Sequence, residues 1–246
     1  MNKLIVIAGP TAVGKTDLAI GLAQALKTEI ISADSVQIFK DLNVGSAKPS
    51  HDEMKGIKHH LLDFLSPKAS FSVSDYVNLA KKEIQRLHAL GKIPVVVGGT
   101  GLYINGLLYE MSFGNSCSDE LFRLKMEELY HARGADHLHG LLQQQDPEAA
   151  QRIHPNNVKR VIRALEIIHV TGKPMGDFST DLVFTKDYEV ILVTLTRSRE
   201  VLYDRINRRV LLMLDAGLVD EVKNLKNLGL DDSYQSMQGI DRKSVV

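Results

Sequence analysis

The chain has 246 residues, 44% of them hydrophobic and 24% charged, which is ordinary for a globular protein with a sizeable core. Its single cysteine, Cys117, excludes a disulfide within the chain and a cysteine zinc site. The formal net charge is zero, so a nucleic-acid partner would need a local basic patch. The apolar run 4–8 is too short for a membrane span and no signal-peptide cleavage pattern follows it, so we expect a cytoplasmic protein, without a membrane partner and monomeric.

The first elements along the chain predict a parallel sheet. Residues 4–8 have the character of a buried strand, 16–26 show apolar residues at helical spacing, and 29–32 form a second short strand. Strand, turn, helix and strand in this order make a βαβ unit. Residues 39–67 show no clear period, and we expect mostly loop with a short helix there.

The next elements continue the same alternation. An amphipathic helix is expected over 74–90, with Gly91 as the residue that ends it. Residues 93–97 are a further buried strand, and the glycine-rich turn at 98–101 opens another helix. The alternation of strands and helices indicates an α/β fold with a parallel sheet flanked by helices.

The pattern then changes to helices alone. Residues 119–172 are helical in period and contain no candidate strand. Three elements follow: a strand at 190–195 and helices at 198–215 and 218–228. We therefore predict a discontinuous catalytic domain, 1–112 and 186–246, interrupted by an inserted all-helical lobe at 113–185.

A phosphate-binding motif follows the first strand. The pattern G-x-x-x-x-G-K-[ST] is matched by Gly9, Pro10, Thr11, Ala12, Val13, Gly14, Lys15 and Thr16. The glycines let backbone amides surround a phosphate, Lys15 adds a positive charge, and the Thr16 hydroxyl is suited to Mg²⁺. No acidic residue ends the strand at 93–97, so the motif favours an oligophosphate with magnesium over ATP hydrolysis. The alternative is a glycine-rich turn without a ligand.

A carboxylate follows the second strand. Asp34 lies just beyond 29–32, and the carboxyl edge of a parallel sheet faces the ligand crevice. Asp34 could accept a proton from a nucleophile, or hold magnesium through water. The alternative is that Asp34 caps the following turn.

Several long blocks together resemble the tRNA dimethylallyltransferase (tRNA isopentenyltransferase) family. The blocks are GPTAVGKT at 9–16, SADSVQIFKDLNVGSAKPS at 32–50, HHLLD at 59–63, PVVVGGTGLYINGLL at 94–108, DPEAAQRIHPNNVKRVIRALEI at 146–167 and RINRRVLLMLDAGLVDEV at 205–222. The resemblance implies a P-loop NTPase-like fold with a helical insertion. It also implies a prenyltransferase that moves a dimethylallyl group from dimethylallyl diphosphate to the exocyclic amine of the adenosine 3′ of the anticodon in tRNA. A diphosphate leaving group would explain why the motif has no partner acid.

The resemblance also implies roles for single residues. Asp34 matches the general base, and Thr100 the threonine that touches the reacting centre. Lys15 and the loop amides would stabilise the diphosphate, with Thr16 as the ligand of the Mg²⁺ cofactor. The three residues after Asp34 would contact the extruded adenosine: Ser35, Val36 and Gln37.

Arg123 and the helix at 158–163 match positions that meet tRNA. At 100° per residue, Lys159, Arg160 and Arg163 cluster in one arc of that helix, with the apolar residues of 158–165 on the opposite arc. This arrangement supports a basic patch for RNA. The alternative is an ordinary solvated basic face.

Arg205 and Arg209 stand one helical turn apart. They lie at the edge of an apolar stripe formed by Leu202, Ile206, Val210 and Met213. Arginines at such an edge can reach inward to a diphosphate. The alternative is that they follow the apolar surface outward or form salt bridges.

The resemblance weakens at the end of the chain. After 237–240 the family continues Gly-Tyr-Lys-Glu and runs several tens of residues further, whereas this chain has Asp241, Arg242, Lys243 and Ser244 and stops at Val246. We expect diphosphate binding to survive this change and tRNA transfer to be weakened. The rival readings are an adenylate isopentenyltransferase, a small-molecule kinase that binds ATP at the same loop, and an inactive RNA-binding remnant.

Overall fold

The computed structural model describes residues 2–111, 119–174 and 183–239. The chain forms two compact units, one made of Met1–Glu110 with Phe184–Val246 and the other of Met111–Val183. Within the described ranges, none of the helices combines the length and the apolar character that a membrane span requires. The altered end at 241–246 and Cys117 lie outside the described residues.

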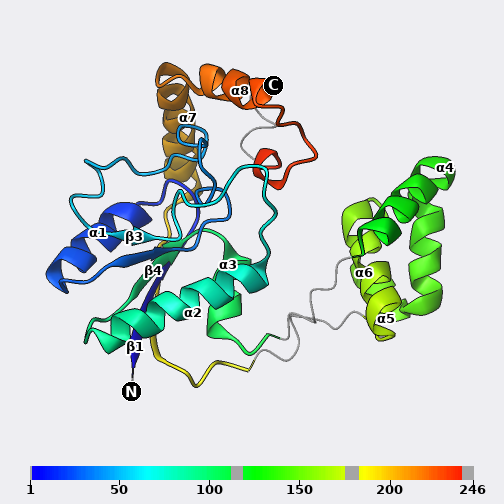
Figure 1. The fold of residues 1–246 in the computed structure, drawn as a ribbon, viewed down its shortest axis with the longest axis horizontal. Helices are drawn as coiled ribbons and strands as arrows, with labels where there is room; N and C mark the ends of the chain where they lie inside the picture. The colour runs from blue at the N-terminus through cyan, green and yellow to red at the C-terminus, as the bar shows by residue number, and fades with distance from the viewer. Residues whose placement is uncertain (1, 112–118, 175–182, 240–246) are drawn as a thin grey trace. The chain divides into compact units, whose positions relative to one another are not determined.

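The larger unit is built on a parallel sheet. Its strands are β1 (Lys3–Ala8), β2 (Ile30–Ser32), β3 (His59–His60), β4 (Val95–Gly98) and β5 (Glu189–Thr194), in the spatial order β3-β2-β4-β1-β5 (Figure 1). Every pairing is parallel, so the carboxyl ends of all strands lie at one edge. Ligands of open α/β sheets bind at this edge.

Helices cover both faces of this sheet. The helix α1 (Lys15–Ala25) lies on one face, and α2 (Val73–Ala89) and α3 (Gly101–Leu108) lie on the other (Figure 1). Alternate strand residues point to opposite faces. The core under α1 contains Ile5, Ile7, Ala19, Ile20, Ala23, Ile30 and Val95. The α/β class predicted from the sequence is therefore confirmed.

The loop at 39–67 differs from the prediction. The expected short helix is absent from it, and it consists of turns, bends and irregular segments, with β3 paired to β2. A two-residue strand is too short to show a hydrophobic period. The His60 side chain is 9% exposed, and its two ring nitrogens lie 2.6 Å from Glu29 and 3.3 Å from Glu83. A strand packed through polar side chains of this kind shows no apolar pattern in the sequence, so β3 was not predicted.

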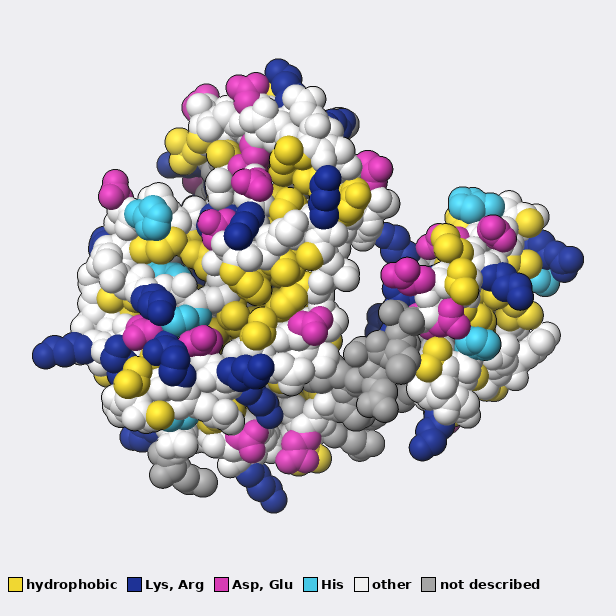
Figure 2. All heavy atoms as spheres, in the orientation of Figure 1, with side chains coloured by type: hydrophobic (Ala, Val, Ile, Leu, Met, Phe, Trp, Pro, Cys, Tyr) yellow, Lys and Arg dark blue, Asp and Glu magenta, His cyan; other side chains and the backbone are white. Residues whose placement is uncertain are grey.

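The end of the larger unit carries two helices, α7 (Arg199–Asp215) and α8 (Leu218–Asn227). All of α7 is described, and none of its residues is buried. The predicted apolar stripe is only partly covered, because Leu202, Ile206 and Met213 are half-buried and Val210 is 37% exposed. Outside the stripe, Leu211 and Leu212 are 61% and 67% exposed. Figure 2 shows hydrophobic side chains reaching the surface of this unit. Contacts made by its polar side chains therefore add to the partial burial of this face in holding α7.

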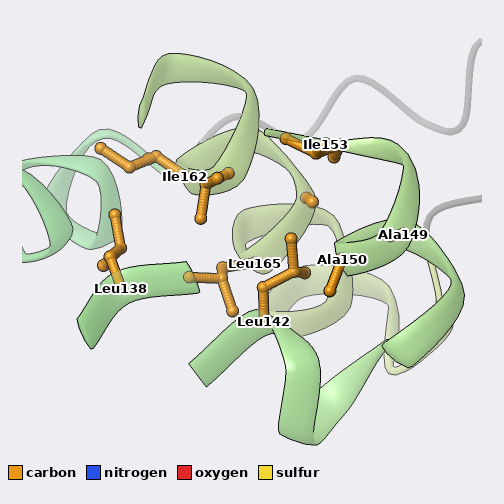
Figure 3. Close-up of a cluster of buried hydrophobic side chains, with 9 residues drawn as sticks. Leu138, Leu142, Ala149, Ala150, Ile153, Ile162 and Leu165 are labelled. Atoms are coloured by element: carbon orange, nitrogen blue, oxygen red, sulfur yellow. The ribbon is translucent and has the colours of Figure 1, made fainter. Parts of the chain in front are cut away.

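The smaller unit contains helices only, among its described residues. They are α4 (Glu120–Gln145), α5 (Pro147–Arg152) and α6 (Val158–Thr171). Their shared core (Figure 3) consists of Leu138, Leu142, Ala149, Ala150, Ile153, Val161, Ile162, Ala164 and Leu165. The predicted division of α6 into an apolar and a basic arc is confirmed by burial, because Lys159 and Arg160 are exposed.

Candidate active site at the carboxyl edge of the sheet

The phosphate-binding loop joins β1 to α1. Gly14 caps the start of α1 with a φ of 105°, in the left-handed region that favours glycine. A Cβ added at Gly9 would lie 2.6 Å from the backbone oxygen of Leu195, the residue after β5. Gly14 is therefore required by its backbone conformation and Gly9 by the close approach of Leu195. The loop presents its amides at the start of a helix, where anions bind.

Lys15 is held by its own loop. Its Nζ donates to the carbonyl oxygens of Gly9, at 2.9 Å, and Pro10, at 2.7 Å. Burial lowers the pKa of the Lys15 ammonium, while the charge of Asp34 raises that pKa and the charge of Arg209 lowers it. The predicted phosphate ligand and the predicted base are therefore close enough to interact electrostatically.

Three arginines contact the same loop. Arg205 Nε donates to the carbonyl oxygen of Ala12 at 2.6 Å, and Arg209 Nη1 to Thr11 Oγ1 at 3.3 Å. Arg197 Nε donates to the carbonyl oxygen of Val13 at 3.0 Å. Arg197 was not predicted from the sequence, although its place just after β5, at the carboxyl edge next to β1, was a usable signal.

Asp34 uses one carboxylate oxygen for the turn that follows it. Its Oδ1 accepts hydrogen bonds from the amides of Val36, at 2.9 Å, and Gln37, at 3.1 Å. For Oδ2, the described part of the chain provides no hydrogen-bond donor. The turn-capping and proton-accepting readings are thus compatible, because each would use a different oxygen.

The turn after β4 brings Thr100 to Asp34. Thr100 Oγ1 accepts from the amide of Ser35 at 2.9 Å and lies 3.2 Å from the Ser35 hydroxyl, to which it donates. A Cβ added at Gly98 would lie 2.0 Å from the backbone oxygen of Ala33. Only glycine therefore lets β4 approach β2 so closely, and this approach places Thr100 next to the Asp34 turn.

A cleft of about 1480 Å³ lies between part of the phosphate loop and Asp34, whereas Ser35, Val36 and Thr100 are not among its lining residues. Its lining includes the predicted phosphate residues Thr11–Thr16, the arginines Arg205 and Arg209, and the predicted acceptor-side residues Asp34 and Gln37. The cleft is large enough for a drug-sized ligand, since typical ligand pockets measure about 300–1,000 Å³. The phosphate end and the acceptor end predicted from the sequence thus share one cavity.

Two of the predicted tRNA-binding residues of the helical unit are paired with a carboxylate of the protein. Arg123 Nε and Arg163 Nη1 both donate to the carboxylate of Glu166, at 2.8 Å and 2.5 Å. Glu166 is fully buried and also accepts from the amide of Asp119 at 2.9 Å. Arg123 and Arg163 therefore have a structural partner, Glu166, that was not predicted from the sequence.

Comparison with known proteins identifies the family. A family model described as IPP transferase matches residues 37–246. The tRNA dimethylallyltransferase of Alkaliphilus oremlandii is 50% identical over 245 residues, which are 100% of this chain and 78% of that protein. The tRNA dimethylallyltransferase of Bacillus velezensis is 48% identical over 244 residues, covering 99% of this chain and 77% of the relative. The chain belongs to the IPP transferase family.

Solved structures agree with this assignment. The full-length tRNA isopentenylpyrophosphate transferase from Bacillus halodurans has a TM-score of 0.68 and 44% identity, covering 99% of this IPP transferase and 76% of that chain. A eukaryotic dimethylallyltransferase acting on tRNA has a TM-score of 0.79 and 32% identity, covering 97% and 59%. The P-loop NTPase-like fold expected from the resemblance is therefore confirmed.

Proposed function

We propose that this IPP transferase moves the dimethylallyl group of dimethylallyl diphosphate to the exocyclic amine of the adenosine 3′ of the anticodon in tRNA. One observation carries the proposal: an intact phosphate loop and the carboxylate of Asp34 line the same cleft at the carboxyl edge of the sheet. The relatives named tRNA dimethylallyltransferase support this reading over a kinase. A tRNA acceptor also favours the cytoplasm as the place of action.

The diphosphate would bind at the loop. Residues 11–16 of the loop, Lys15 among them, line the cleft, and Arg205 and Arg209 reach the loop from α7. These groups stabilise the negative charge that develops on the diphosphate as the allylic C–O bond breaks. Arginine is well suited to this task because its planar group binds two phosphate oxygens at once.

Thr16 would provide the hydroxyl for a magnesium ion. Thr16 is exposed and lines the same cleft as Asp34. Mg²⁺ is usually held by one or two protein oxygens together with substrate phosphates, and a hydroxyl beside a diphosphate site fits that pattern. When bound, the ion would supply further neutralisation of the diphosphate charge.

Asp34 would act as the general base. As the new N–C bond forms, the amine releases a proton, which Asp34 Oδ2 accepts while Oδ1 keeps its two amide donors. Ser35, Val36, Gln37 and Thr100 would contact the adenosine, which must leave its base stack to reach the cleft. The hydrogen bonds between Thr100 and Ser35 hold this turn in place.

The helical lobe, predicted at 113–185, would bind the tRNA. Its exposed Lys159 and Arg160 offer positive charge to phosphates, and Arg123 and Arg163 retain exposed surface beside Glu166. Neutralising phosphates releases counterions. Affinity for tRNA should therefore fall steeply with salt, and a flat salt profile would remove this patch from the proposal.

The test is incorporation of labelled dimethylallyl groups into unmodified tRNA in the presence of magnesium. The matched variant is Asp34→Asn, because asparagine keeps an acceptor for the amides of Val36 and Gln37 but is not a base. We expect transfer to fall by about 10²- to 10⁴-fold, with pyrophosphate affinity within about twofold of wild type. Asp34→Ala should lose the turn as well.

Two results would contradict the proposal. Equal losses of transfer and pyrophosphate binding in Asp34→Asn would make Asp34 a structural or metal-site residue. ATP-dependent phosphorylation of a small molecule without a prenyl donor, together with no label in RNA, would favour the kinase reading.

A further inference from the structure

Glu221 of α8 binds a loop that is distant in the sequence. Its Oε2 accepts hydrogen bonds from the amides of Asn43 and Val44, both at 2.7 Å, and its Oε1 accepts from the amide of Gly45 at 2.9 Å. Three successive amides that converge on one carboxylate form an anion-binding turn. Charge-assisted hydrogen bonds of this kind are roughly twice as strong as neutral ones, so the contact is a firm link between α8 and residues 43–45.

This loop leads to the proposed base. Gln37 Nε2 donates to the backbone oxygens of Ser46, at 3.1 Å, and Ala47, at 3.0 Å. The amide of Gln37 in turn donates to Asp34 Oδ1 at 3.1 Å. A continuous series of hydrogen bonds and short backbone segments therefore connects Glu221 to the acceptor end of the cleft.

The helix that carries Glu221 is joined to α7, which contacts the phosphate end of the cleft. The helix α8 is anchored by buried Leu218 and Leu225 and follows α7 after a short turn at Gly217. The helix α7 has no buried residue but carries Arg205 and Arg209, which contact the loop at 9–16. Because no residue of α7 is fully buried, we expect the arginine contacts and α8 to contribute to its placement.

We propose that Glu221 is a positioning residue for prenyl transfer. By holding α8 to residues 43–45, it fixes the arginines of α7 over the phosphate loop at a set distance from Asp34. This inference rests on the function proposed above, because it gives Arg205 and Arg209 a diphosphate to bind. A purely structural Glu221 would affect stability without changing diphosphate affinity.

The variant Glu221→Gln tests this role. Its amide nitrogen would face backbone N–H groups in place of one carboxylate oxygen, so the link should weaken while the side-chain volume is kept. The matched control is Asp220→Asn, which removes the same charge one residue away, where the carboxylate is exposed and contacts Lys223 at 3.4 Å.

Three measurements on the full chain decide the outcome. Hydrogen exchange of the amides of residues 43–45 should accelerate in Glu221→Gln and stay as in wild type in Asp220→Asn. The Kd for pyrophosphate should rise by about tenfold in Glu221→Gln, within the range of typical coupling between sites. Combined with Arg205→Met, the loss should be smaller than the product of the two separate losses, because Glu221 would act on diphosphate binding through Arg205.

The failures are distinguishable. Faster exchange at residues 43–45 with an unchanged Kd for pyrophosphate would overturn the positioning role and leave a structural one. Unchanged exchange would show that the Glu221 link does not hold the loop, and would overturn the inference at its first step. Wild-type protein that binds no pyrophosphate would overturn the proposed function itself, and this inference with it.

Discussion

The two units use arginine in opposite ways. At the cleft, Arg205 donates to a neutral backbone oxygen, so its charge remains available to an anion. In the helical unit, Arg123 and Arg163 are paired with the buried carboxylate of Glu166, so much of their charge is compensated by the protein. Arginines that are alike in the sequence thus differ in what they can offer a ligand, and the partner decides which role dominates.

The largest effect should come from breaking the compensated group. The double variant Arg123→Met, Arg163→Met leaves Glu166 buried without its cations, which costs about 3–5 kcal/mol for a buried ion pair. Urea unfolding measures the loss, and hydrogen exchange of α4 and α6 assigns it to the helical unit. A double variant as stable as wild type would show that the ion pairs of Glu166 do not stabilise the helical unit. Binding of tRNA would then be the remaining role for both arginines.

A smaller effect, of another kind, is expected at the cleft. Arg205→Met and Arg209→Met should each weaken pyrophosphate binding by about 10- to 100-fold, corresponding to the ~1.5–3 kcal/mol of a hydrogen bond to a charged group. The free energy of unfolding should change by less than about 0.5 kcal/mol, as at exposed sites. Calorimetry and urea unfolding measure the two quantities.

The matched control for this pair is Arg199→Met. Arg199 lies on the same helix, and in the described residues its contacts are with Tyr203. Pyrophosphate affinity should stay at the wild-type value. A loss equal to that of Arg205→Met would mean that general positive charge, and not contact with the loop, determines binding.

A third test asks whether compensated charge also occurs in the α/β unit. Burial alone would raise the pKa of Glu29, but hydrogen bonds from Lys92, His60 and Arg86 lower it from 4.5 to about 2. A carboxylate with a lowered folded-state pKa stabilises the fold above its unfolded pKa and loses that contribution as the pH falls. The stability supplied by Glu29 should therefore disappear between about pH 4.5 and pH 2.

The variant Glu29→Gln isolates this contribution. At neutral pH it should be less stable by about 1–3 kcal/mol, as expected when charged partners lose an acceptor, and the difference from wild type should shrink as the solution is acidified. Urea unfolding at several pH values measures it. A difference that stayed constant down to pH 2 would assign the effect to packing and not to charge.

The smallest effect is expected at an exposed ion pair. Lys81 Nζ lies 3.0 Å from Asp187 Oδ2, and the two side chains are 38% and 55% exposed. Solvent screens such pairs, so Asp187→Asn should cost about 0.2–1 kcal/mol or less, and the cost should vanish in high salt. A loss comparable to that of the Glu166 group would show that burial does not decide how much an ion pair contributes to the stability of this protein.

Local sequence signals predicted much of the fold. The strand before Gly9 and the helix after Lys15 follow from apolar periodicity, and Gly91 ends α2 in the left-handed conformation, with a φ of 69°, as expected. The two-residue β3 and the absence of a core under α7 were not predictable, because neighbouring segments decide them.

The candidate site likewise has parts that the sequence predicts and parts that it does not. The phosphate loop and Asp34 were predictable because a parallel sheet brings its strand ends to one edge. The link from Glu221 to residues 43–45 spans up to 178 positions, and nothing in the local sequence indicates which carboxylate will meet which amides. The pairing of Arg123 with Glu166 was hidden for the same reason, since a helical wheel shows the faces of one helix and not its partners.

The three glycines of the motif Gly98-Gly99-Thr100-Gly101 differ in the space that a side chain would have. At Gly98 any side chain would collide with the Ala33 oxygen, at Gly99 a Cβ would stand 3.7 Å from Lys15 Nζ, and at Gly101 there is nothing within 4 Å. A mutational library across this turn should therefore tolerate glycine alone at the first position and alanine at the last. A motif search that gives the three glycines equal weight would therefore misjudge which substitutions disrupt the turn.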